Sequence, residues 1–104
     1  IPPGFRAWIE TGRHPGGQAA IANDFRQSVL VALDLPAEQK SPAVVSELNR
    51  MGTDILAAGD RGRILAVPMI WTAFRTRATT EADERYGVWR NQVETHGRQQ
   101  AIAV

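Results

Sequence analysis

Apolar side chains return every third or fourth residue along most of this 104-residue chain, and clusters of proline and glycine interrupt the spacing. Residues 4–11, 18–34 and 42–58 each carry such a row, which is the pattern of a helix with one buried face. Residues 14–17 (His-Pro-Gly-Gly) and 35–36 (Leu-Pro) separate these segments, because proline and glycine end helices. Ser41 then precedes Pro42 as a helix N-cap. The first half of the chain is therefore predicted to be three helices.

The secondary structure of residues 63–78 is less clearly determined. An apolar run in this segment suits a buried strand, but Pro68 lacks the amide hydrogen that a strand ladder needs. A helix with Pro68 in its first turn, after a turn at residues 59–62, is easier to form. The residues that such a helix would bury are Met69, Ile70, Ala73 and Phe74. We favour a helix, and a strand stays the alternative for residues 63–71.

A last helix is expected to open at Thr79 or Thr80 and to reach Gly97 or beyond. Thr80 and Asp83 have the spacing of a capping box, in which two side chains bond the first free amides of a helix. The buried face of this helix would be Tyr86, Trp89 and Val93. A chain of this length has room for one hydrophobic core. We therefore predict an all-α fold, a compact single-domain bundle of four to five helices over residues 1–104.

Composition removes several kinds of chemistry. The chain has no cysteine, which excludes disulfides, zinc–thiolate sites and thiol nucleophiles. Its two histidines, His14 and His96, do not have the spacing of a metal site and are expected to be solvated. No serine has the glycine neighbours of a nucleophile elbow. We expect no metal, no cofactor and no enzymatic activity.

The chain is also expected to avoid membranes, because its longest apolar run has eight residues and a membrane-spanning helix needs about 20. The lack of cysteine fits a cytoplasmic location, either inside a cell or in a virion. Because the first residue is Ile1 and not methionine, the presence of an upstream segment stays open. The oligomeric state stays open as well.

Arginine dominates the basic residues: eleven of the twelve are arginine, while the net charge is only +1. Three arginine pairs are expected near helix ends or turns, namely Arg61/Arg63, Arg75/Arg77 and Arg85/Arg90. If these ends meet, they would form a basic rim, with Trp71, Trp89 and Tyr86 as possible neighbours. Arginine with tryptophan is the composition of protein-interface hot spots and also of surfaces that stack single-stranded nucleic acid. A third interpretation places the arginines at helix ends and the aromatic residues in the core. The residues predicted to bind a partner protein are Arg61, Arg63, Arg75, Arg77, Trp8 and Trp89.

One segment resembles a known group of proteins. Ile9-Glu10-x-Gly12-x-x-Pro15-Gly16-Gly17, followed by a helix with Asn23-Asp24-Phe25, is similar to a segment of short uncharacterised proteins of tailed phages. The resemblance covers about residues 8–33 and implies a phage or mobile-element origin. We therefore expect a small non-catalytic accessory or assembly protein that caps, inhibits or joins a larger complex by protein binding. A nucleic-acid-binding regulator with an arginine-rich face is the alternative.

Overall fold

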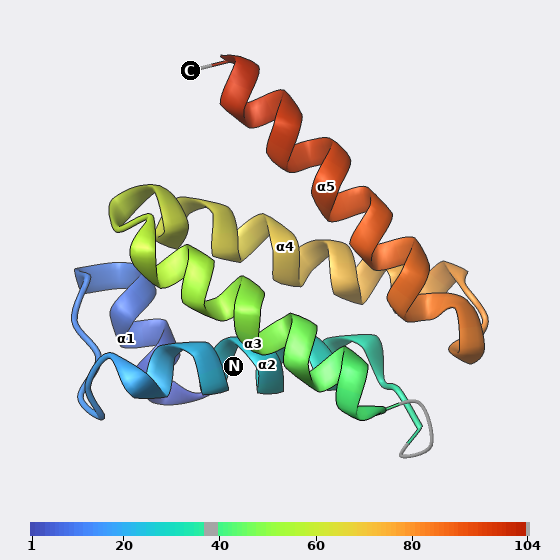
Figure 1. The fold of residues 1–104 in the computed structure, drawn as a ribbon, viewed down its shortest axis with the longest axis horizontal. Helices are drawn as coiled ribbons and strands as arrows, with labels where there is room; N and C mark the ends of the chain where they lie inside the picture. Colours follow the sequence, from blue (N-terminus) through green and yellow to red (C-terminus); the bar gives the residue numbers. More distant parts are fainter. Residues whose placement is uncertain (37–39, 104) are drawn as a thin grey trace.

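The fold is given by a computed structural model that describes residues 1–36 and 40–103, with side chains described as far as Thr95 (Figure 1). Its elements are α1 (Pro3–Thr11), α2 (Ala19–Leu33), α3 (Pro42–Ala57), α4 (Asp60–Thr79), the short 3₁₀ segment η2 (Ala82–Glu84) and α5 (Arg85–Ala103). This described part of the chain contains no strand, so the predicted all-α bundle is confirmed. None of its helices is both long and apolar enough to span a membrane.

The ends of α1 and α3 follow from the residues at those positions. Gly12 adopts φ 81° after α1, and its amide donates to the Trp8 carbonyl, which closes the helix with a residue that tolerates left-handed backbone. The Ser41 hydroxyl accepts a hydrogen bond from the Val44 amide at 3.3 Å, so the predicted N-cap of α3 is confirmed. Sequence and structure agree to within about one residue at both helices.

The core is built around α2, which packs against α1, α3 and α4. Phe25, Val29 and Leu33 on α2 are fully buried, and Phe5 of α1 meets Phe25 with ring centroids 6.5 Å apart. The first turns of α5 lie beside the C-terminal half of α4 (Figure 1). Trp89 is fully buried there, and its indole nitrogen donates to the Met69 carbonyl of α4 at 2.9 Å. The helices α1, α2, α3 and α4 and the first turns of α5 therefore share a single hydrophobic core.

The turn between α3 and α4 is shorter than predicted. It comprises only Ala58 and Gly59, and α4 begins at Asp60. Gly62 lies inside the helix, at a close approach of α4 to α3: a Cβ on Gly62 would be 1.7 Å from the Ile55 carbonyl oxygen. The prediction of a turn through residue 62 is wrong because this glycine serves helix packing and not chain reversal.

The strand alternative for residues 63–71 is excluded, and Pro68 lies inside α4 and not in its first turn. Proline removes the hydrogen bond to the carbonyl four residues earlier. That carbonyl belongs to Ile64, an exposed residue, so water can take the place of the missing donor. The Thr72 hydroxyl donates to the Pro68 carbonyl at 2.8 Å.

The capping box predicted at the start of the last helix does not form. Thr80 is an extended residue after α4, and η2 intervenes before α5 begins at Arg85. The residue before η2 is Glu81, and its side chain caps nothing in η2. The chain therefore re-enters a helix through a 3₁₀ turn and not through reciprocal side-chain caps.

Candidate functional site

Four large apolar side chains of α4 point away from the core. Ile64, Val67, Trp71 and Phe74 are 69%, 37%, 63% and 41% exposed. Successive spacings of three, four and three residues place them on one face of the helix. We call these four residues the α4 outer face. Among the buried residues of α4, Ala66 and Ala73 lie on the opposite side, and Ile70 lies at the border between the two sides. The helix α4 is therefore apolar on two sides, and only one of them meets the core.

Two aromatic rings form the largest part of the α4 outer face. Trp71 and Phe74 contact each other with ring centroids 6.1 Å apart and planes tilted by 55°. This tilted geometry is favourable for aromatic pairs. Phe74 was predicted to be buried, and that prediction is wrong because its position on the helix turns it toward solvent. The pair presents a large apolar surface in an arrangement set before any partner arrives.

The apolar surface continues onto α2. Val31 of α2 is 68% exposed, and a hollow of about 100 Å³ lies between it and Phe74. The rest of its lining is Ile70 of α4, Gln27 and Ser28 of α2, and Ile1 and Pro2 at the start of the chain. Because a water molecule occupies about 30 Å³ of the liquid, this hollow has room for one branched aliphatic side chain. The face is therefore hollowed at one edge.

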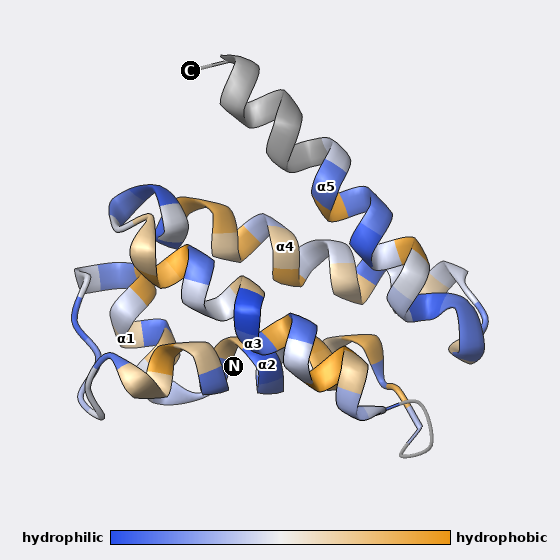
Figure 2. Ribbon diagram, viewed as in Figure 1, coloured by the Kyte–Doolittle hydropathy of each residue, from blue (hydrophilic) through white to orange (hydrophobic). Residues whose placement is uncertain are grey.

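Arginines lie at both ends of the α4 outer face. Arg61 and Arg75 are exposed, and a helical rise of 1.5 Å per residue separates them by about 21 Å. No acidic residue occurs between Arg61 and Thr80. Figure 2 shows the middle of α4 coloured apolar and its two ends hydrophilic. The predicted rim, in which the arginine pairs meet, is wrong because Arg61/Arg63 and Arg75/Arg77 lie at opposite ends of one continuous helix.

Of the four predicted arginines, Arg63 has a structural role. Its Nη1 donates to the Ile9 carbonyl at 3.3 Å, and its Nε and Nη2 donate to Asp60 at 3.1 and 2.6 Å. It thus caps the end of α1. Arg77 lies 3.7 Å from Asp34, at the limit of an ion pair, with both side chains largely exposed. Arg61 pairs with no acidic side chain in the described part of the chain.

The predicted aromatic anchors do not lie on the surface. Trp8 is 4% exposed and Trp89 is fully buried, so both belong to the core and cannot anchor a partner in this conformation. The exposed tryptophan is Trp71, which was predicted as a possible neighbour of the arginines and not as an anchor. Its exposure depends on which face of α4 meets the core. The sequence alone does not determine this face, because both a helix and a strand are possible for residues 63–71.

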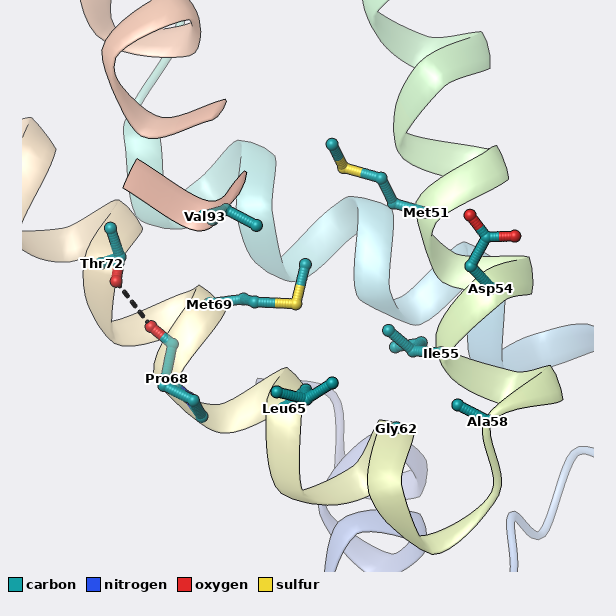
Figure 3. A pocket seen from close by; sticks show the side chains of 10 residues that line it. All are labelled: Met51, Asp54, Ile55, Ala58, Gly62, Leu65, Pro68, Met69, Thr72 and Val93. Carbon is teal, nitrogen blue, oxygen red and sulfur yellow. Dashed lines mark hydrogen bonds between the residues drawn. The ribbon is translucent and has the colours of Figure 1, made fainter. Parts of the chain in front are cut away.

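A second apolar feature is a cleft of about 250 Å³ between α3, α4 and the start of α5 (Figure 3). Met51 and Ile55 line it from α3, Leu65 and Met69 from α4, and Val93 from α5. Small ligands are normally oriented by a few convergent polar groups. The polar lining side chains are Asp54, which is exposed, and Thr72, which already donates to a backbone carbonyl. The cleft offers apolar contact without a group that fixes an orientation.

A largely buried polar pair joins the loop after α1 to α2. His14 Nε2 lies 2.6 Å from Asp24, and the Gly16 amide donates to His14 Nδ1 at 2.9 Å. The imidazole is 7% exposed and lies against Gly4, so the prediction that His14 is solvated is wrong. Because both ring nitrogens of His14 are engaged, this side chain holds the loop at residues 12–18 against α2. His96 lies outside the residues whose side chains are described, and the described residues hold no group of three metal-ligating side chains.

No family model, curated protein or solved structure gives a significant match to this chain. The resemblance of residues 8–33 to phage proteins therefore stays a hypothesis. In the structure these residues form the end of α1, the loop that contains His14, and α2. The evidence for a function rests on the α4 outer face.

Proposed function

We propose that this chain works by binding another protein through the α4 outer face. The observation that carries the proposal is Trp71, 63% exposed in the middle of a row of apolar side chains on one helix. Contiguous apolar patches on small proteins mark interaction sites. Tryptophan, together with arginine, is enriched among the residues that dominate binding energy. Trp71 with Arg75 beside it fits that pattern.

The magnitude favours a binding role for Trp71. A tryptophan side chain can bury up to about 250 Å², so an exposed fraction of 63% leaves roughly 150 Å² in water. Covering that area is worth at most ~4 kcal/mol at about 25 cal/mol per Å². The same side chain contributes little to folding where it stands. The free energy of covering this surface is therefore available to the binding of a partner.

The resemblance of residues 8–33 extends the proposal to a phage or mobile-element accessory or assembly protein. In that role the chain would cap, inhibit or join a larger complex without catalysing a reaction. The exposed face supports the binding part of this proposal, and the resemblance alone supports the origin.

Nucleic acid is the alternative partner, since Trp71 beside Arg75 is a combination that stacks single-stranded bases. The rest of the face argues against it, because Ile64 and Val67 offer no donor to a phosphate and the net charge is only +1. A salt titration separates the two, since an affinity set by several phosphate contacts falls steeply with salt.

The test uses a protein captured by the wild-type chain, then purified and measured alone. Trp71→Ala is expected to raise its Kd about thirtyfold or more, about 2 kcal/mol, because a central hot-spot residue is removed. The melting temperature should hardly change, since Trp71 is exposed. Gln92→Glu alters an exposed position of α5 and should leave the Kd unchanged. Equal Kd values for wild type and Trp71→Ala would contradict the proposal.

A further inference from the structure

We infer that the segment bound by the α4 outer face is an amphipathic helix with acidic residues at both ends of its apolar row. This inference rests on the proposed function and adds the chemistry of the partner. Its physical basis is the juxtaposition of an apolar row with a guanidinium at each end.

Charge defines the ends of the partner segment. At the N-terminal end of α4, Asp60 accepts two hydrogen bonds from Arg63, which leaves Arg61 without an acidic partner among the described side chains. At the other end, Arg75 donates to the Thr72 hydroxyl and to no carboxylate of the described residues. Two cations about 21 Å apart, or about four helical turns, thus lack compensating anions within this set. A partner with carboxylates at the same separation supplies them.

Shape selects a helix over other acidic segments. The row from Ile64 to Phe74 is about 15 Å long, which matches an apolar row of similar length on a second helix. The hollow between Val31 and Phe74 can receive one aliphatic side chain of that helix, as a ridge of one helix fills a groove of another. A flat stacked base offers no such side chain to this hollow.

A second copy of the chain fits the face poorly. In an antiparallel two-fold pairing centred between Val67 and Trp71, the arginine pair at each end of α4 meets the opposite pair of the other copy. In a parallel pairing each arginine meets its own counterpart. Like charges directly opposed are destabilising. The arginines at both ends therefore select an acidic partner and disfavour self-association.

Two synthetic helical peptides of about 16 residues, enough for four turns, test the inference. Both carry leucines spaced three and four residues apart; one has glutamates at its two ends and the other has lysines. Wild-type protein should bind the glutamate peptide about threefold to tenfold more tightly at low salt. In the double variant Arg61→Glu, Arg75→Glu the preference should reverse. Both positions are exposed, and a circular-dichroism spectrum checks that the variant folds.

The outcomes separate this inference from the proposed function. Equal affinity for the two peptides, with both lost in Trp71→Ala, would uphold the face as a protein-binding site and overturn the acidic partner. Binding of neither peptide would overturn the inference too. So would a dimer in sedimentation that Trp71→Ala dissolves. Displacement of the glutamate peptide by a single-stranded oligonucleotide or by anionic vesicles would assign the face to another class of partner.

Discussion

The arginines of this chain fall into two groups: some bond to the ends of helices and stabilise the fold, and others are exposed at the surface. Arg63 donates to the end of α1, and Arg85 donates to the Leu33 and Asp34 carbonyls at the end of α2. A planar guanidinium is well suited to such carbonyls, which have no partner inside their own helix. Among the described residues, Arg61 and Arg75 donate to no such carbonyl. The carbonyls lie more than fifty residues away in the sequence, so sequence alone cannot tell the two groups apart.

Tyr86 of α5 packs against the hydrophobic core, close to Glu47 of α3. Its hydroxyl is buried and forms no hydrogen bond of good geometry with the described residues. Burial, and then the negative charge of Glu47, raise the pKa of Tyr86 from 10.0 to about 12. Glu47 itself lies 2.7 Å from Arg90 Nε, which ties α3 to α5. The folded chain therefore favours the neutral phenol more strongly than the unfolded chain does.

This shift predicts an alkaline loss of stability that depends on Tyr86. Between about pH 10 and 12 the unfolded chain releases the phenol proton while the folded chain keeps it, so the free energy of unfolding should fall as pH rises. Below pH 10 the proton is bound in both states and this contribution is constant. Urea unfolding at several pH values measures the slope. Tyr86→Phe should be less steep than wild type in this window, and parallel curves would refute the assignment.

At the scale of elements, two glycines inside helices have opposite surroundings. A Cβ at Gly62 would meet the backbone of Ile55 at 1.7 Å, whereas a Cβ at Gly87 in α5 would have nothing within 4 Å. We predict that Gly62→Ala lowers the free energy of unfolding by about 2–3 kcal/mol, because α3 and α4 must separate.

Gly87→Ala is the matched control. It should raise the free energy of unfolding by about 0.5–1 kcal/mol, because alanine has the higher helix propensity and no neighbour is displaced. Thermal unfolding of the two variants beside wild type measures both changes. A stable Gly62→Ala would mean that α3 and α4 do not cross at this point.

The elements were predictable where a local signal marks them. Gly12 and Ser41 identify the end of α1 and the start of α3 without any tertiary information. The predictions at Gly62 and Pro68 were wrong because each residue type has two common structural roles. Glycine marks turns and also close helix contacts, and proline marks first turns and also tolerated positions inside exposed helices. Only the packing of α3 against α4 decides between them.

The whole molecule has one core and more apolar helix surface than that core can cover. In the described part of the chain, α1, α2, α3 and α5 and their order were predictable from the spacing of apolar residues. For α4 that spacing left helix and strand open, and Pro68 favoured the helix. The α4 outer face was not predictable, because Trp71 and Phe74 share a run with Ile70 and Ala73, which are buried. Periodicity cannot assign faces to a helix that is apolar on two sides. A helix that is apolar on two sides, in a chain with room for a single core, was the signal in the sequence that could have indicated an exposed apolar face.

Fluorescence quenching tests the outward placement of the α4 face most directly. Of the three tryptophans, Trp71 is 63% exposed, Trp8 is 4% exposed and Trp89 is fully buried. Iodide should therefore quench one tryptophan and spare the other two, and it should act more strongly than caesium because Arg75 attracts anions. In Trp71→Phe the quenchable emission should disappear. Iodide quenching that is unchanged in Trp71→Phe would show that Trp71 is covered, and the account of the binding face would be wrong.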